Sequence, residues 1–151
     1  MNPDDWLLLC RRVHFGDTDA AGVVHFHQLL RWSHEAYEDS LERFGIAAAT
    51  IFPTPGAGLE VALPIVHCSA DFRGPLVCGD PLAIRLEPRL LDPGAFEVRY
   101  RFRSNDRAIA TTLTRHLAIG AGNRQRCDLP DPIRRWLEAS TLAAGVLVVA
   151  V

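Results

Sequence analysis

The spacing of hydrophobic residues divides this 151-residue chain into a helical segment and a series of strand-like segments. Between Phe26 and Phe44, apolar or small residues recur every three or four positions, which predicts an amphipathic helix of about five turns. Gly45 follows it and is typical of a residue that ends a helix. The segment is longer than a usual helix, so we expect it to be the central element around which a sheet wraps.

The other segments show the two-residue alternation of strands with one buried face. It is strictest from Leu82 to Leu90 and from Phe96 to Phe102. Further strands are expected over residues 6–15, 59–72 (interrupted at Pro64) and 108–119, with hairpin turns at residues 92–94 and 105–107. A short closing helix is expected over residues 131–140. The order strand, long helix and four strands in a meander predicts an α+β fold with an antiparallel five-stranded sheet.

One helix cannot cover both faces of such a sheet, so we expect self-association as a homodimer or homotetramer. Residues 1–140 are interpreted as one domain, and residues 141–151 as an apolar C-terminal tail of unassigned role. The tail is far shorter than the roughly 20 residues that span a bilayer, and we expect no membrane partner.

Composition and charge narrow the function. A net charge of -2 without a large basic cluster argues against a nucleic-acid partner. The four cysteines are widely spread and form no CxxC pair, and no signal peptide is evident. Reduced thiols and a cytoplasmic location are therefore predicted.

The loop before the long helix is the strongest candidate for chemistry. Asp17 and Asp19 lie two residues apart, and Gly22 completes a turn that leads into the helix. The first turn of a helix has unpaired N–H donors and a partial positive charge, so one region can hold an ionised carboxylate beside donors for an oxyanion. The arrangement predicts acyl-transfer chemistry, in which one aspartate acts and the other caps a turn.

Other motifs are weaker or missing. His25, His27 and His34 do not have the spacing of a defined metal site, and we predict no bound metal. His67 and Cys68 are adjacent in a strand, so their side chains should face opposite sides and cannot act together. A nucleophile elbow, a phosphate-binding P-loop and a dinucleotide fingerprint do not occur in the sequence, which argues against serine hydrolases, NTPases and dinucleotide enzymes.

These residues resemble the 4-hydroxybenzoyl-CoA thioesterase family of hotdog-fold proteins. The resemblance covers about residues 8 to 120, and its most specific part is the stretch Asp17-Thr-Asp-Ala-Ala-Gly-Val-Val24. Segments 34–38, 63–67 and 78–80 are most similar to the hydrolases that act on 1,4-dihydroxy-2-naphthoyl-CoA in phylloquinone (vitamin K1) synthesis. The resemblance implies a hotdog fold, an acyl-CoA substrate and no cofactor, since coenzyme A is part of the substrate.

The resemblance also implies roles for individual residues. Asp19 would be the catalytic carboxylate, as nucleophile or general base, and the backbone N–H at Phe26 would polarise the thioester carbonyl. His34 stands where the 4-hydroxybenzoyl enzymes have a carboxylate that meets the ring hydroxyl. The naphthoyl hydroxyls could be bound by three histidines, His25, His34 and His67.

Several alternatives remain open on the sequence. Glu35 is the second candidate for the catalytic carboxylate, because some hotdog thioesterases use a glutamate on the helix. The substrate could instead be 4-hydroxybenzoyl-CoA or a short-chain acyl-CoA. Two other classes of hotdog protein are also alternatives for this chain. One is a non-catalytic acyl-CoA-binding module, which would require no catalytic carboxylate, and the other is a dehydratase, which would require a paired histidine and carboxylate.

Overall fold

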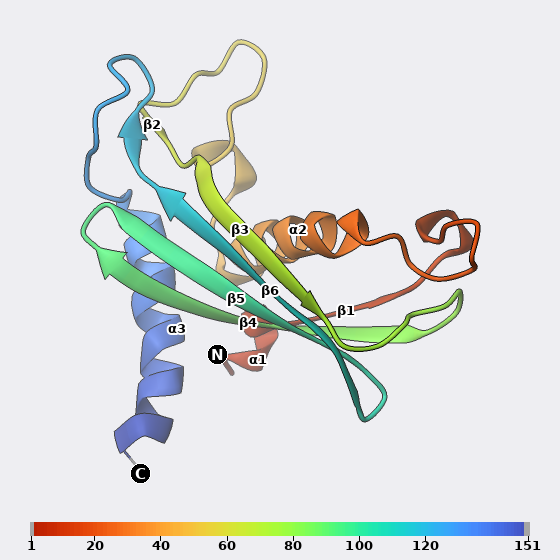
Figure 1. The fold of residues 1–151 in the computed structure, drawn as a ribbon. Helices are drawn as coiled ribbons and strands as arrows, with labels where there is room; N and C mark the ends of the chain where they lie inside the picture. The colour runs from red at the N-terminus through yellow and green to blue at the C-terminus, as the bar shows by residue number, and fades with distance from the viewer. Residues whose placement is uncertain (1, 150–151) are drawn as a thin grey trace.

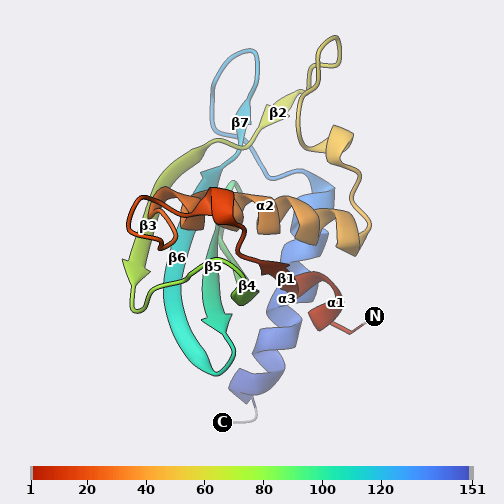
Figure 2. The ribbon, with the colours of Figure 1, turned by 90° about the vertical axis from the view of Figure 1, so that its right-hand side faces the viewer.

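The computed structural model describes residues 2–149, with the surroundings of side chains given for residues 2–142. A five-stranded antiparallel sheet curves around one long helix, α2, which crosses its concave face (Figures 1 and 2). The elements are α1 (Asp4–Leu7), β1 (Leu8–Arg12), the 3-10 turn η1 (Phe15–Asp17), α2 (His27–Phe44), the 3-10 turn η2 (Ala48–Thr50), β2 (Val61–Ala62), β3 (Ile65–Phe72), β4 (Pro81–Asp92), β5 (Ala95–Ser104), β6 (Arg107–Leu117), β7 (Ile119–Gly120) and α3 (Asp131–Val149).

The strand order corrects the predicted meander of four strands. The order is β1-β4-β5-β6-β3, so only β4, β5 and β6 form a meander. β3 pairs with β6 at the far edge, while β1 pairs with β4 at the other edge. The short strands β2 and β7 pair separately. Alternation within a strand specifies which side chains are buried, but it carries no information on the neighbouring strand.

The core lies between α2 and the inner face of the sheet. Trp32, Tyr37 and Leu41 of α2 are at most 1% exposed. They meet the inner side chains of β4 and β5, among them Leu82, Ile84, Leu86, Phe96, Val98, Tyr100 and Phe102. Burying each such side chain contributes about 1.5–3 kcal/mol, so the apolar stripe of α2 is what holds the helix on the sheet. The predicted helix and its end at Gly45, which has a φ of 105°, are confirmed.

Both ends of the chain differ from the predicted elements. The strand expected over residues 6–15 is limited to β1, because residues 4–7 form α1 and pack on α2. The helix expected to close at Ser140 continues to Val149, so the predicted tail begins inside α3, and residues 150–151 lie outside the described part. Trp136 Nε1 donates to Ser40 Oγ at 3.0 Å and docks α3 on α2.

The outer face of the sheet is charged, as its alternation predicts, with one difference. Glu97 is 6% exposed although it lies on this polar face. Arg89 on β4 and Arg115 on β6 flank it at 2.6 and 3.2 Å, directly across the strands. Two cross-strand guanidinium groups compensate the charge of a carboxylate that alternation alone places in solvent.

Candidate active site

The loop from Asp19 to Gly22 is a tight turn that closes on itself. Gly22 N–H donates to Asp19 O at 3.0 Å, and Asp19 N–H donates to Val23 O at 2.8 Å. Gly22 has a φ of 81°, a left-handed conformation that glycine adopts without strain. Val24 N–H then bonds Leu76 O at 2.8 Å. The turn is thereby tied to the connection between β3 and β4.

The carboxylate of Asp19 is exposed, and only one of its two oxygens is hydrogen-bonded. Its Oδ1 accepts a hydrogen bond from Ala21 N–H at 2.8 Å. Its Oδ2 has no partner among residues 2–149. One oxygen is therefore held by the turn while the other is free for an incoming group, as a nucleophile or general base requires.

Asp17 has a different environment. Its Oδ2 accepts a 2.8 Å bond from His14 N–H and lies 3.5 Å from Arg11 Nη2, and its side chain is 12% exposed. Its backbone carbonyl accepts from His25 N–H at 3.1 Å, which brings the start of α2 against the loop. Asp17 thus supports the loop, and both aspartates accept a backbone N–H within a turn.

Arg11 joins the loop to the helix and was missed by sequence reasoning. Its guanidinium carbon lies 4.3 Å above the centre of the Trp32 ring, between Asp17 and Glu35. Leu9 and Val13, two residues before and after Arg11, are both buried, so all three side chains are on the inner side of the first strand. A charged residue at such a position is the sequence feature that could have indicated Arg11.

Glu35 is held by two arginines. Its Oε2 accepts from Arg11 Nη1 at 3.2 Å, and its Oε1 accepts from Arg31 Nε at 3.0 Å. Both carboxylate oxygens are engaged in ion pairs, in contrast to the free oxygen of Asp19. This difference favours Asp19 over Glu35 as the reactive carboxylate.

The first turn of α2 offers free donors. Its N-cap is Phe26, whose side chain caps nothing and is 64% exposed. Within the described residues, the N–H groups of Phe26 and His27 have no acceptor. An oxygen with developing negative charge would find both the donors and the positive end of the helix dipole there. Gln28 in the same turn is a second residue that sequence reasoning missed. Its side chain is buried and its Oε1 has no hydrogen-bond partner in the described chain. The sequence feature that could have indicated it is an amide side chain next to the apolar stripe of the helix.

The three predicted substrate-binding histidines are not brought together. The His25 ring lies 4.6 Å from the Phe26 ring, at the start of α2. His34 is two turns further along α2, and its Nδ1 lies 3.0 Å from Glu38 Oε2. His67 is opposite Arg115 in the sheet, on the outer face, whereas Cys68 is opposite Thr114, whose side chain is buried on the inner face. His67 and Cys68 face opposite sides as expected, and His67 is separated from α2 by the sheet.

A cluster of buried polar side chains lies under the middle of α2. Tyr100 Oη and His116 Nε2 each lie 2.9 Å from Thr114 Oγ1. Burial lowers the pKa of His116 to about 4, with a smaller contribution from His34, and burial raises the pKa of both Tyr37 and Tyr100. His116 is stacked on Phe96 with ring centres 4.5 Å apart. These groups are neutral near pH 7 and support the core.

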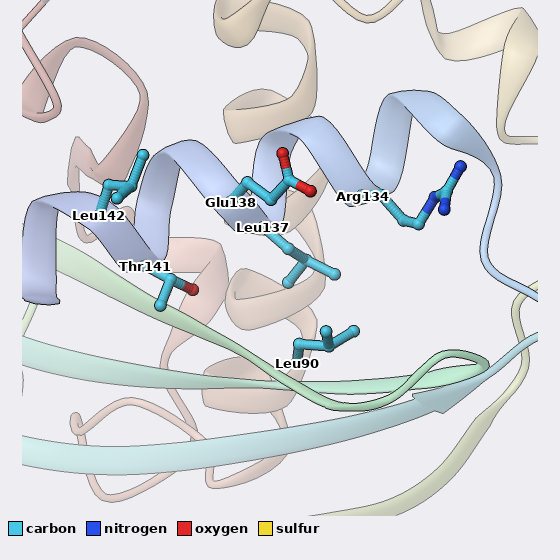
Figure 3. A pocket seen from close by; sticks show the side chains of 6 residues that line it. All are labelled: Leu90, Arg134, Leu137, Glu138, Thr141 and Leu142. Atoms are coloured by element: carbon cyan, nitrogen blue, oxygen red, sulfur yellow. The ribbon is translucent and has the colours of Figure 1, made fainter.

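A cavity of about 500 Å³ lies elsewhere, between β4 and α3. Leu90 and Leu137 face each other across it, and Arg134, Glu138, Thr141 and Leu142 complete the lining (Figure 3). No residue predicted for the active site lines it. Its position therefore gives no support to a catalytic role.

Two further findings concern metals and membranes. Among residues 2–149, no three histidine, cysteine, aspartate or glutamate side chains are grouped so as to bind a metal ion. In the same part of the chain, no helix is both long and apolar enough to span a membrane.

Comparison with known proteins gives consistent matches. The profile of the thioesterase-like superfamily matches residues 13–137. The 1,4-dihydroxy-2-naphthoyl-CoA hydrolase of Synechococcus sp. (strain RCC307) is 63% identical over 128 residues, which is 85% of this chain and 98% of that protein. The hydrolase of the same name from Prochlorococcus marinus (strain MIT 9303) is 57% identical over 93% of this chain and 95% of its own length. The crystal structure of a 1,4-dihydroxy-2-naphthoyl-CoA thioesterase from Synechocystis superposes with a TM-score of 0.80 at 33% identity, covering 87% of this chain and 94% of that one.

Proposed function

Since this chain belongs to the thioesterase-like superfamily, with the hotdog fold, we propose that it hydrolyses 1,4-dihydroxy-2-naphthoyl-CoA to the free acid and CoA in phylloquinone synthesis. The relatives that carry this activity in their names are 53–63% identical over most of the chain. The observation that carries the chemistry is the free Oδ2 of Asp19 in the loop that leads to the unpaired N–H groups of Phe26 and His27.

In the proposed mechanism the thioester carbonyl lies at the start of α2. Its oxygen accepts from Phe26 N–H as negative charge develops. In one route, Asp19 Oδ2 attacks the carbonyl carbon and releases the CoA thiolate, and water then hydrolyses the resulting mixed anhydride to the free acid and restores the carboxylate. In the other, Asp19 Oδ2 takes a proton from the water that attacks the carbonyl carbon and expels the thiolate. Ala21 N–H holds the other oxygen, so the carboxylate keeps one orientation. The reaction uses no cofactor, since coenzyme A enters as part of the substrate.

The test compares two isosteric variants. Asp19→Asn retains the Oδ1 acceptor for Ala21 and should fold normally, but we expect kcat to fall by about a thousandfold or more. Glu35→Gln serves as the matched control and should keep kcat within about tenfold, because Glu35 is occupied by arginines. Thiol release from the naphthoyl thioester measures both. Near-normal turnover by Asp19→Asn would contradict the role of Asp19 as the catalytic carboxylate. A loss of kcat in Glu35→Gln alone would assign that role to Glu35.

A panel of thioesters tests the substrate. We expect 1,4-dihydroxy-2-naphthoyl-CoA to be preferred to 4-hydroxybenzoyl-CoA and to short aliphatic thioesters. Hydrolysis of aliphatic thioesters alone would support thioesterase activity but refute the assignment to phylloquinone synthesis. Binding of all thioesters without release of thiol would instead identify an acyl-CoA-binding module.

We propose further that the protein self-associates, as a homodimer or homotetramer, in the cytoplasm. β3 is an edge strand, and Ile65, Val66 and Phe72 on it are 42–54% exposed. Unpaired strand edges with apolar side chains readily pair with another chain. The four free cysteines are consistent with a reducing compartment. Sedimentation at micromolar concentration should give a dimer or tetramer, and a monomer would refute the assembly.

A further inference from the structure

Leu90 is an apolar side chain at the end of β4 that the protein core does not cover. Leu82, Ile84 and Leu86 precede it on the inner face of the same strand and are at most 2% exposed, whereas Leu90 is 49% exposed. The cavity of about 500 Å³ between β4 and α3 opens beside it, and Leu137 faces it across the cavity (Figure 3). The inner face of the sheet therefore lacks its last covering side chains at this point.

α3 continues past this cavity as an apolar helix. Residues 142–151, here called the apolar run, contain no polar or charged side chain, and the helix extends through them to Val149. These turns lead away from α2 (Figures 1 and 2), and Leu142, the first residue of the run, is 70% exposed. A helix that is apolar on all sides is normally buried, so the run requires a cover that α2 does not provide.

The apolar run cannot fill the cavity of its own molecule. Leu137 is part of the cavity wall, and the helix continues from it to Val149 over about 18 Å. A continuous helix does not turn back onto a wall that its own earlier turns form. The run of a second copy can reach the cavity. In a two-fold contact between antiparallel α3 helices, each run lies in the cavity of the other copy, because the contacts of such a pair are reciprocal.

The charges around the cavity favour a second copy over a lipid surface. Arg134 and Glu138 have opposite charges at the rim, which suits an uncharged occupant. Basic clusters bring apolar helices to anionic bilayers, but residues 128–138, which precede the run, contain two arginines and three acidic residues, a net charge of -1. A bilayer surface also does not fill a recess of this size, whereas the side chains of a helix do.

We propose that the cavity beside Leu90 binds the apolar run of a second copy of this chain, with α3 against α3 about a two-fold axis. The contact is separate from the pairing proposed for β3, because β5 and β6 lie between β4 and β3 in the sheet. Two different two-fold contacts combine in a tetramer. The profile of the superfamily ends at residue 137, so the run lies outside the matched part of the chain. The inference does not depend on the proposed activity.

The experiment measures the mass of the assembly by sedimentation of the full chain at micromolar concentration. Leu142→Asp and Leu90→Asp should each halve the mass, because a carboxylate without a partner is strongly unfavourable in an apolar contact. Both side chains are exposed in the single copy, so thermal unfolding should remain cooperative. Thiol release should be unchanged, because no residue predicted for the active site lines the cavity.

The control places the same charge next to the cavity. Leu91 is 38% exposed and adjacent to Leu90 but does not line the cavity, so Leu91→Asp should leave the mass unchanged. An unchanged mass in either Leu142→Asp or Leu90→Asp, or an equal loss in Leu91→Asp, would overturn the inference. Vesicles of phosphatidylcholine and phosphatidylglycerol test the lipid surface. Binding of the unmodified protein to them, lost in Leu142→Asp without a change of mass, would assign the apolar run to a membrane and overturn the inference as well.

Discussion

Replacing Arg11 tests whether the ion-pair network really supports the catalytic loop. Arg11 contacts Asp17 below the loop, Glu35 on α2 and the face of Trp32. Arg11→Met removes the charge and the donors but keeps a flexible apolar stem of similar length, so the packing against Trp32 is largely preserved. The change therefore isolates the electrostatic contacts.

The expected cost follows from the exposure of each contact. The pair with Glu35, whose side chain is 42% exposed, is worth about 0.5 kcal/mol, and Arg31 remains beside that carboxylate. The contact with Asp17 is long at 3.5 Å but only 12% exposed on the aspartate side, and contributes about 0.5–1 kcal/mol. The guanidinium over Trp32 adds a similar amount. We expect a total of about 2 kcal/mol, which lowers the Tm of a chain of this size by about 4–8 °C.

The assay is thermal and urea unfolding of Arg11→Met beside Arg12→Met. Arg12 is the adjacent strand residue, is exposed, and lies on the other side of β1, so it controls for the lost charge. Turnover should also fall in Arg11→Met, because Asp17 anchors the loop that carries Asp19. If Arg11→Met lost no more stability than Arg12→Met, the network would have no role in holding the loop.

Two further predictions concern the buried polar groups. Tyr37→Phe should leave the free energy of urea unfolding unchanged within about 0.5 kcal/mol or raise it, because the buried hydroxyl has no partner in the described chain. Tyr100→Phe should lower it by about 1 kcal/mol, because the hydrogen bond to Thr114 is lost. Equal costs would show that the Tyr37 hydroxyl is bonded. Burial lowers the pKa of His116 to about 4 from 6.5, so the unfolded chain binds more protons between these values and stability should fall as the pH drops through this window. Calorimetry should show a smaller fall for His116→Gln, and identical pH profiles would contradict a buried neutral histidine.

The candidate site was predicted in part, and the successes have a common cause. The loop of Asp19, the turn at Gly22 and the start of α2 are consecutive in the chain, so short-range geometry brings them together. Arg11, which supports them, was not found: Asp17 is six residues away, but Trp32 and Glu35, which hold the guanidinium from the helix, are more than twenty residues away. His67 was grouped with His25 and His34 by residue type alone, and the sheet register places it on the outer face.

The sequence by itself determined the elements and their buried sides. The helical period ended by Gly45 specified α2, and strict alternation specified the inner faces of β4 and β5, because propensity and periodicity act between residues close in the chain. Only the tertiary structure decided that β3 crosses to β6 and that Glu97 is buried between two arginines. Strand order and burial depend on which distant segments meet, and that choice is made by the packing of the whole core rather than by any local pattern.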